Sequence, residues 1–146
     1  MLCSQAKPMR VLLSIKPVFA ALIFSGKKEF EYRRTIFRNP QVKTVVVYAS
    51  APEKKVVGEF EVADVHYDDI HTLWAKTGGR GGISRETFLD YFSGKTSGFA
   101  IEIGEVRYYS QPRHLKEMFN VRPPQSFVYL DTRNANTAKD EVRHFS

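Results

Sequence analysis

Residues 26–33 read Gly-Lys-Lys-Glu-Phe-Glu-Tyr-Arg, a glycine followed by charged residues that begin to alternate with aromatic ones. Over residues 29–35 the aromatic side chains fall on one parity and the polar side chains on the other. This alternation is typical of a strand with one face in the core and the other in water. In the preceding residues 18–23 apolar side chains recur at helical spacing, and Gly26 suits a left-handed helix end. The segment therefore predicts a helix, a sharp turn and a half-buried strand.

Outward from this segment, the chain shows further short strands and helices. Strands are expected near residues 11–15, 44–49, 55–65, 99–108 and 127–129, and helices near 17–24, 69–76, 84–92 and just after Pro112. The β-branched run at 44–49 is typical of a central strand covered on both sides, and it should form a hairpin with 55–65. Five or six short strands with small inserted helices predict an α+β fold, built as a mixed barrel or a strongly curled sheet.

The chain has 146 residues, of which 42% are hydrophobic, enough for one sizeable core and too few for two ordinary domains. We expect one domain over residues 10–130. Residues 1–9 should form a flexible N-terminus, and the polar, aperiodic residues 131–146 a flexible C-terminal tail.

Charge and cysteine usage narrow the class of protein. The formal net charge is +6, which favours partners that carry phosphate. The single cysteine, Cys3, cannot form an internal disulfide, and no apolar run approaches the roughly 20 residues that a membrane helix needs. We therefore expect a cytoplasmic protein that has no membrane partner.

The opening segment also matches a family signature. Gly26, Lys28, Glu31 and Arg33 fit the pattern G-x-K-x-x-E-x-R, and the segment resembles that of ASCH domains, which are similar to PUA domains. Gly58-Glu59-Phe60 and the segment Arg122–Phe127 resemble those of small bacterial, archaeal and phage ASCH proteins as well. The resemblance spans about residues 11–130 and implies a PUA-like mixed β-barrel with a ligand cleft beside the signature.

The resemblance also implies a range of functions. Proposed roles in the family are RNA binding, transcription regulation through coactivation and, in some members, RNA-modifying or nucleoside-hydrolysing chemistry. One bacterial branch comprises acetylcytidine amidohydrolases, which use the signature lysine together with a threonine at the place where this chain has Glu31. Because that threonine is missing, an acyl-transfer mechanism in this chain would rest on Lys28 alone.

The spacing of the signature suggests how its side chains meet. Glu31 and Arg33 lie two apart and share a strand face, whereas Lys28 should lie in the turn that Gly26 permits and swing toward them. The planar guanidinium of Arg33 could then donate paired hydrogen bonds to a phosphate or to the edge of a base. The plainer alternative is a ladder of ion pairs on an exposed strand face. Catalysis by lysine would need more, because an amine with a pKa near 10.4 is a poor base unless burial or nearby cations lower that pKa.

Further basic side chains are expected to contact a nucleic-acid backbone. They are Lys27, Arg34, Arg38, Lys54, Lys55 and Arg80. Tyr32 should point inward, so Trp74, Tyr108 and Tyr109 are the preferred cleft aromatics. The glycine-rich stretch 77–82 could cradle phosphate, but a flexible connection is the favoured interpretation.

Two remaining features concern the cleft and metals. In the segment 122–127, Gln125 and Ser126 are candidates to line the cleft, and Phe127 is equally well read as an anchor that closes the core. The four histidines show no metal-ligand spacing and there is no cysteine pair, so we expect neither a metal site nor a cofactor.

These observations leave three functional hypotheses. The leading one is a domain that binds RNA or another nucleic acid, with Gly26, Lys28, Glu31 and Arg33 lining the ligand cleft. The second is a metal-independent hydrolase of a modified nucleoside or RNA, either acetylcytidine amidohydrolase-like or a ribonuclease, with Lys28 as base and Glu31 as a second acid or base. The third is a regulatory domain that binds a partner.

Overall fold

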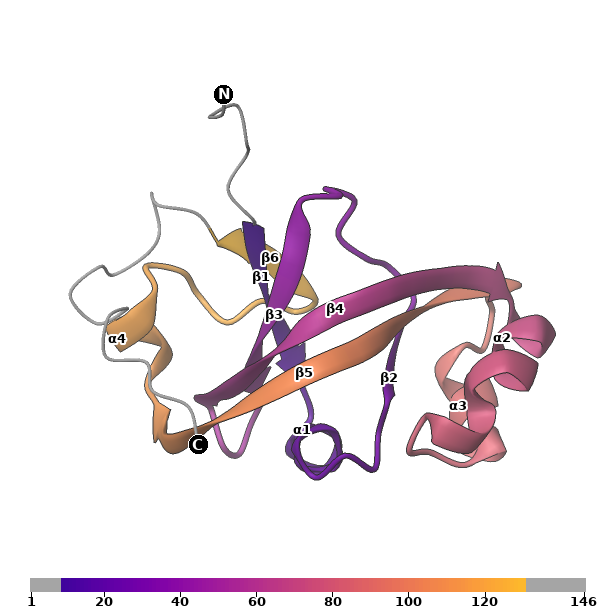
Figure 1. Ribbon diagram of the computed structural model, residues 1–146, viewed down its shortest axis with the longest axis horizontal. Coiled ribbons are helices and arrows are strands. Elements are labelled where there is room, and N and C mark those ends of the chain that lie inside the picture. Colours follow the sequence, from indigo (N-terminus) through magenta and orange to yellow (C-terminus); the bar gives the residue numbers. More distant parts are fainter. Residues whose placement is uncertain (1–8, 131–146) are drawn as a thin grey trace.

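The computed structural model describes residues 9–130 as one mixed sheet with short helices around it (Figure 1). In chain order the elements are β1 (Met9–Ile15), α1 (Pro17–Phe24), β2 (Phe30–Arg33), β3 (Val42–Ala49), β4 (Lys55–Asp69), α2 (Ile70–Thr77), the 3-10 turn η1 (Gly78–Arg80), α3 (Arg85–Tyr91), β5 (Ser97–Arg113), α4 (Leu115–Met118) and β6 (Phe127–Leu130). Apart from Met9, which begins β1, the two ends predicted to be flexible lie outside the described residues. None of the helices within 9–130 has the length and apolar character needed to span a bilayer.

The six strands lie in the order β2-β5-β4-β3-β1-β6. Strands β1 and β3 run parallel and the other neighbours are antiparallel, so the sheet is mixed as predicted. The β-branched run at 44–49 lies in β3, inside the sheet, and forms the expected hairpin with β4. The sheet curls in a barrel-like manner but does not close, because β2 and β6 are its two edges.

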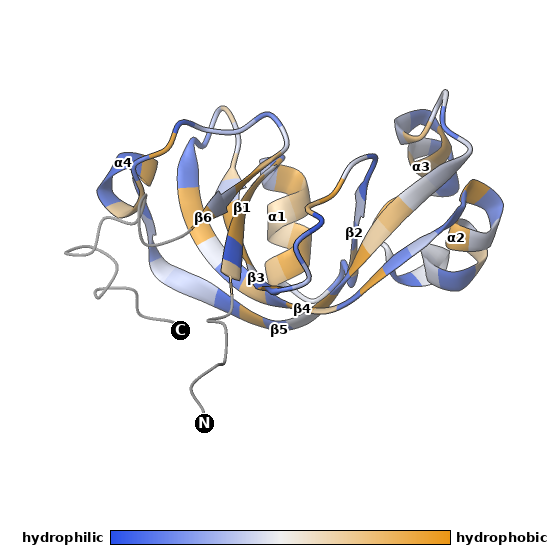
Figure 2. Ribbon diagram, turned by 90° about the horizontal axis from the view of Figure 1, so that it is seen from above, coloured by the Kyte–Doolittle hydropathy of each residue, from blue (hydrophilic) through white to orange (hydrophobic). Residues whose placement is uncertain are grey.

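The long strands β4 and β5 form the frame of the molecule. Their pairing shifts register at three places, and such bulges bend and twist an antiparallel ribbon. Figure 2 shows the resulting arc, with α1 on its concave side, α4 near one end and α2 and α3 near the other. Helices therefore lie at both ends of the ribbon, and β1, β2 and α1 lie on the concave side of its middle.

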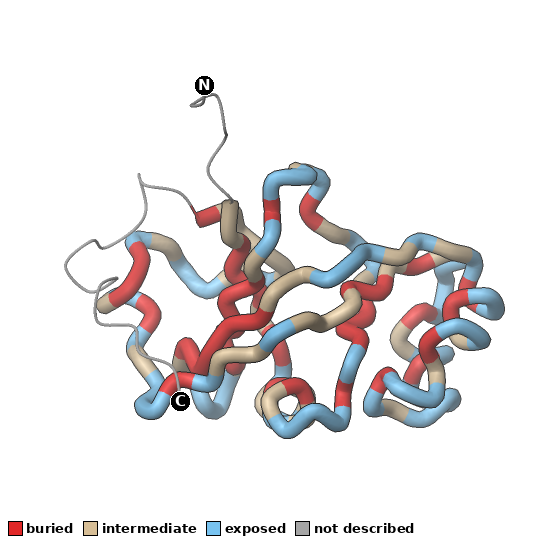
Figure 3. Tube along the Cα trace, in the orientation of Figure 1, coloured by how far each residue is buried: buried red, intermediate tan, exposed pale blue. Residues whose placement is uncertain are grey.

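Buried apolar side chains form three clusters. Figure 3 marks the buried residues along the strands and helices. The largest cluster fills the inside of the curl and includes Leu13, Val47, Phe60 and Ile101. A second packs beneath α4, and a third joins β2 and β5 to α2 and α3. Because both faces of the sheet are covered in this way, little of β1 or β3 reaches solvent.

The turn between α1 and β2 forms as predicted from local signals. Pro17 occupies the first turn of α1, where its missing N–H leaves no bond unmade. Gly26 has a φ of 83°, and the backbone N–H groups of Lys27 and Lys28 both donate to Leu22 O. This reversal directs the Lys28 side chain back toward β2.

One expectation for β2 was wrong. The strand is shorter than predicted, and the polar face expected to be wet is largely covered: Glu31 is only 6% exposed. That face points into the concave side of the curled sheet, where segments distant in sequence close over it.

Candidate functional site

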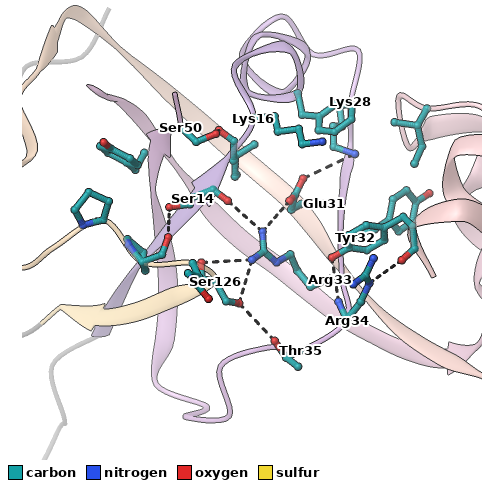
Figure 4. Close-up of a pocket in the computed structure, with 18 of the residues that line it drawn as sticks. Ser14, Lys16, Lys28, Glu31, Tyr32, Arg33, Arg34, Thr35, Ser50 and Ser126 are labelled. Atoms are coloured by element: carbon teal, nitrogen blue, oxygen red, sulfur yellow. Dashed lines mark hydrogen bonds and ion pairs between the residues drawn. The ribbon is translucent and has the colours of Figure 1, made fainter. Parts of the chain in front are cut away.

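A cleft of about 1200 Å³ lies where β2 faces the start of α1 and the segment 123–126. Lys28, Glu31 and Arg33 all line it, so the structure brings these three signature side chains together (Figure 4). Gly26 is not among the lining residues, and its part is to form the turn before Lys28.

Lys28 is an almost fully buried cation with a polar and aromatic surround. Its side chain is 3% exposed, and Nζ lies 3.9 Å from Oε1 of Glu31. Nζ donates a hydrogen bond of 2.8 Å to Gly81 O and lies 4.9 Å from the centre of the Tyr32 ring. Burial lowers the pKa of Lys28 from its usual value, and the nearby Glu31 carboxylate opposes this shift only in part. The structure therefore provides the buried environment that a basic lysine requires.

The glycine-rich stretch 77–82 forms a packed wall beside Lys28. Besides the carbonyl of Gly81 that accepts from Lys28, the Thr77 hydroxyl lies 2.8 Å from that of Tyr32. A Cβ at Gly81 would collide with the Tyr32 hydroxyl, and one at Gly82 would lie 2.8 Å from Lys28 Cβ. Lys28, in the turn after α1, and Tyr32, in β2, occupy the space beside Gly81 and Gly82, so this part of the stretch is packed rather than open to solvent.

The Arg33 side chain, on edge strand β2, forms hydrogen bonds to residues at the other edge of the sheet, although these segments do not pair as strands. Its Nη1 donates to Glu31 Oε2 at 3.3 Å and to Ser14 O at 3.4 Å. Its Nη2 donates to Ser126 Oγ at 3.1 Å and to Ser126 O at 3.4 Å. The guanidinium fork predicted to bind phosphate is thus directed at acceptors of the protein itself, as Figure 4 shows.

The alternative of an exposed ion-pair ladder was wrong for these charges. The side chains of Lys28, Glu31 and Arg33 are only 3%, 8% and 12% exposed. In water such pairs contribute little to stability, whereas at this burial each charge depends on its partners because no solvent replaces them.

The other basic side chains divide between the cleft and its surroundings. Of the side chains predicted to contact a nucleic-acid backbone, Arg34 and Lys54 line the cleft, whereas Lys27, Arg38, Lys55 and Arg80 do not. Arg80 instead pairs with Glu29 at 3.3 Å. The cleft contains one cation that the sequence reasoning missed, Lys16, which immediately precedes α1. Cations therefore outnumber the lining carboxylates, which are Glu31 and Asp90.

The aromatic side chains preferred as cleft residues lie elsewhere. Trp74 packs on Phe88 with ring centres 5.0 Å apart, Tyr108 packs on Phe24, and the buried Tyr109 donates to Glu59. The aromatics that do line the cleft are Phe19, Tyr32, Tyr48 and Tyr91. Tyr91 carries the Arg34 guanidinium 4.7 Å above its ring, and its backbone carbonyl accepts from Arg34 Nε at 2.7 Å. Because α3 lies far along the chain, no local pattern pointed to Tyr91.

The proline-rich segment fulfils both interpretations offered for it. Gln125 and Ser126 line the cleft, and Ser14 Oγ donates to Pro124 O at 2.5 Å. Phe127 packs edge-on against Phe37 with ring centres 6.1 Å apart. The segment therefore forms a cleft wall that is anchored in the core.

One group of side chains outside the cleft has donor atoms suited to a metal ion. Asp64, His66 and Glu102 lie on the β4–β5 ribbon with their ligand atoms within 4.8 Å of one another. His66 Nε2 lies 2.9 Å from Glu102 Oε1, so the group is also satisfied as a hydrogen-bonded pair. Spacing along the chain could not reveal it, because cross-strand pairing brings the residues together.

Comparisons with known proteins agree with the family resemblance and the fold. The ASCH domain model matches residues 13–125. The ASCH domain-containing ribonuclease of Zymomonas mobilis is 33% identical over 122 residues, which cover 82% of each chain. A crystal structure of ASCH from Zymomonas mobilis superposes with a TM-score of 0.83 at 30% identity, covering 93% of this chain and 96% of that one.

A second relative has a different overall length. The large ribosomal subunit protein uL22 of Ureaplasma parvum is 31% identical over 121 residues, and the match covers 82% of this chain but 39% of that protein. The family match covers α1, strands β2 to β5 and every cleft residue except Ser126, and a related sequence adopts the same fold over nearly its whole length. The chain belongs to the ASCH domain family.

Proposed function

We propose that this protein binds single-stranded RNA in the cleft beside the signature. The observation that carries the proposal is the charge of the cleft: five cations, Lys16, Lys28, Arg33, Arg34 and Lys54, line it together with two carboxylates. A concave surface of this kind concentrates positive potential and attracts phosphate. The volume of about 1200 Å³ exceeds the usual range for small-molecule pockets, which leaves space for more than one nucleotide.

The cations have different roles in this proposal. Lys16, Arg34 and Lys54 are exposed and extend from the rim, where they can follow a flexible phosphate backbone. Arg33 is held by acceptors on two other segments, so it positions Glu31 and the cleft walls. Single strands are favoured over duplexes because only unstacked bases can enter the concave cleft and meet side chains such as Tyr91.

A matched pair of charge variants tests the binding proposal. Lys16→Gln removes a cation from the cleft, and Lys95→Gln removes an exposed cation that does not line it. With a fluorescent single-stranded RNA, Lys16→Gln should weaken binding and reduce the slope of log K against log salt by about one phosphate contact. Equal effects of the two substitutions would instead indicate attraction by overall charge alone.

The buried amine favours a second candidate function, cleavage of the bound RNA. Burial lowers the pKa of Lys28, which increases the fraction of neutral amine available as a general base. The neutral amine would take the proton of a ribose 2′-hydroxyl as that oxygen attacks phosphorus. The P–O5′ bond then breaks, the leaving oxygen takes a proton from water, and the products are a 2′,3′-cyclic phosphate and a 5′-hydroxyl. The name of the related Zymomonas mobilis protein, a ribonuclease, is consistent with this candidate.

Cleavage can be tested separately from binding. RNA and DNA oligonucleotides of one sequence should both bind, but only RNA carries the attacking 2′-hydroxyl, so only RNA should be cut. Lys28→Met should abolish cutting, and product analysis should find cyclic phosphate termini in the wild type. Release of acetate from N4-acetylcytidine, with RNA left intact, would assign the cleft to nucleoside hydrolysis.

A further inference from the structure

An aromatic pair lies exposed on the β4–β5 ribbon, outside the cleft. Tyr67 is 61% exposed, and its ring centre is 4.5 Å from that of the half-buried Phe99 at an interplanar angle of 37°. Val65, on the same strand parity as Tyr67, is 38% exposed. Single exposed apolar side chains are ordinary, but two adjacent, mutually tilted rings on a sheet surface form an apolar step that suggests a ligand.

Strand pairing places this step in the same row as a cleft residue. Phe99 of β5 pairs with Arg33 of β2 on one side and with Tyr67 of β4 on the other. Directly paired residues project from the same face of a sheet, and each strand spacing is about 4.8 Å. The row therefore crosses the strands from Arg33 in the cleft to Tyr67 over two strand spacings, in the part of the β4–β5 ribbon that lies near α2 and α3 (Figure 1).

We propose that Tyr67 and Phe99 form a stacking platform for bases of single-stranded RNA that extends beyond the cleft. The inference rests on the proposed RNA binding and adds a second contact surface to it. Every base has a π face, so a sheet-borne aromatic step next to a cationic groove binds single strands with little dependence on sequence. Arg33, at the cleft end of the row, and Arg34, the residue after β2, both line the cleft.

A second copy of the chain fits this surface less well. Two rings and one valine form a small patch, whereas a stable protein interface usually buries about 800 Å² on each partner. The row is also continuous with the cationic cleft, which suits a polyanion that carries its own aromatic groups.

Substitutions at Tyr67 test the platform in the full chain. Tyr67→Ala removes the ring, and Tyr67→Phe is the matched control that keeps it; the exposure of this side chain leaves the core untouched in both. Binding would be measured by fluorescence anisotropy with a labelled oligo(A) RNA of twelve nucleotides, checked afterwards on a denaturing gel, and with the dinucleotide ApA as a probe short enough for the cleft alone. Tyr67→Ala should weaken binding of the long RNA at least about fivefold, while Tyr67→Phe stays near the wild type.

The possible outcomes distinguish the stacking platform from the proposed RNA binding in the cleft. Unchanged binding of ApA by Tyr67→Ala, together with weakened binding of the long RNA, supports the platform. Equal binding of the long RNA by wild type and Tyr67→Ala would overturn the platform and leave RNA binding in the cleft standing. If the wild type bound neither RNA, both would fail. A wild-type dimer that Tyr67→Ala converts to a monomer in sedimentation would assign the step to self-association and also overturn the platform.

Discussion

The ammonium of Lys28 lies 3.9 Å from the carboxylate of Glu31, and both side chains are almost entirely removed from water. The two residues come from different local structures, the turn after α1 and the edge strand β2. Arg33 pairs with Glu31 and also donates to Ser126, next to the other edge strand. The three charges therefore connect the Lys28 amine to residues at both edges of the sheet. The protonation of Lys28 and the geometry of Arg33 are therefore the properties to test first.

The rate of RNA cleavage should depend on pH through Lys28. Because burial lowers the pKa of Lys28, the neutral amine forms below the usual 10.5, and the rate should rise with pH and level off above the lowered pKa. Glu31→Gln removes the charge that favours the ammonium, so the rising limb should move to lower pH. A pH–rate profile measures this, and a limb that does not move would exclude Lys28 as the base.

The free energy of unfolding should also depend on pH through Lys28. A lysine with a lowered pKa binds fewer protons in the folded than in the unfolded state, so folding stability rises as pH increases from the folded pKa toward 10.5. Lys28→Met lacks this titration. Thermal denaturation of both proteins across this pH range should show the wild type gaining on Lys28→Met as pH rises, and a constant difference would contradict the assignment.

The geometry of the Arg33 guanidinium should contribute more to folding stability than its positive charge does. Arg33→Lys keeps the positive charge but cannot reach Glu31, Ser14 and Ser126 together. We expect a loss of about 2 kcal/mol in the free energy of unfolding, since hydrogen bonds to charged groups contribute about 1.5–3 kcal/mol. Urea denaturation measures this. Arg38→Lys, at an exposed position outside the cleft, is the control and should change stability by less than about 0.5 kcal/mol.

Gly79 and Gly81, on either side of Arg80, should respond differently to substitution by alanine. A Cβ at Gly81 meets the Tyr32 ring and hydroxyl, whereas one at Gly79 meets nothing within 4 Å. Gly81→Ala should therefore cost about 1–3 kcal/mol through overpacking, and Gly79→Ala should be close to neutral. Chemical denaturation compares the two variants directly. Equal free energies of unfolding would show that the residues around Gly81 rearrange to accept a Cβ without loss of stability.

Much of the local structure around the cleft could be read from the sequence. Pro17 and Gly26 mark the beginning of α1 and the turn after it, and the alternation that follows marks β2. The β-branched run of β3 indicated burial on both sides, and the signature indicated the ASCH family. These predictions were confirmed because each depends on residues that are near one another in the chain.

The sequence by itself thus determined the order of the elements, the family and the meeting of Lys28, Glu31 and Arg33. Only the tertiary structure decided that their face is buried, that Arg33 is held by Ser14 and Ser126, and that Lys16 and Tyr91 join the cleft while Trp74 does not. The physical reason is that periodicity specifies which side chains share a face, whereas what covers that face depends on the curl of the sheet and on segments up to about a hundred residues away.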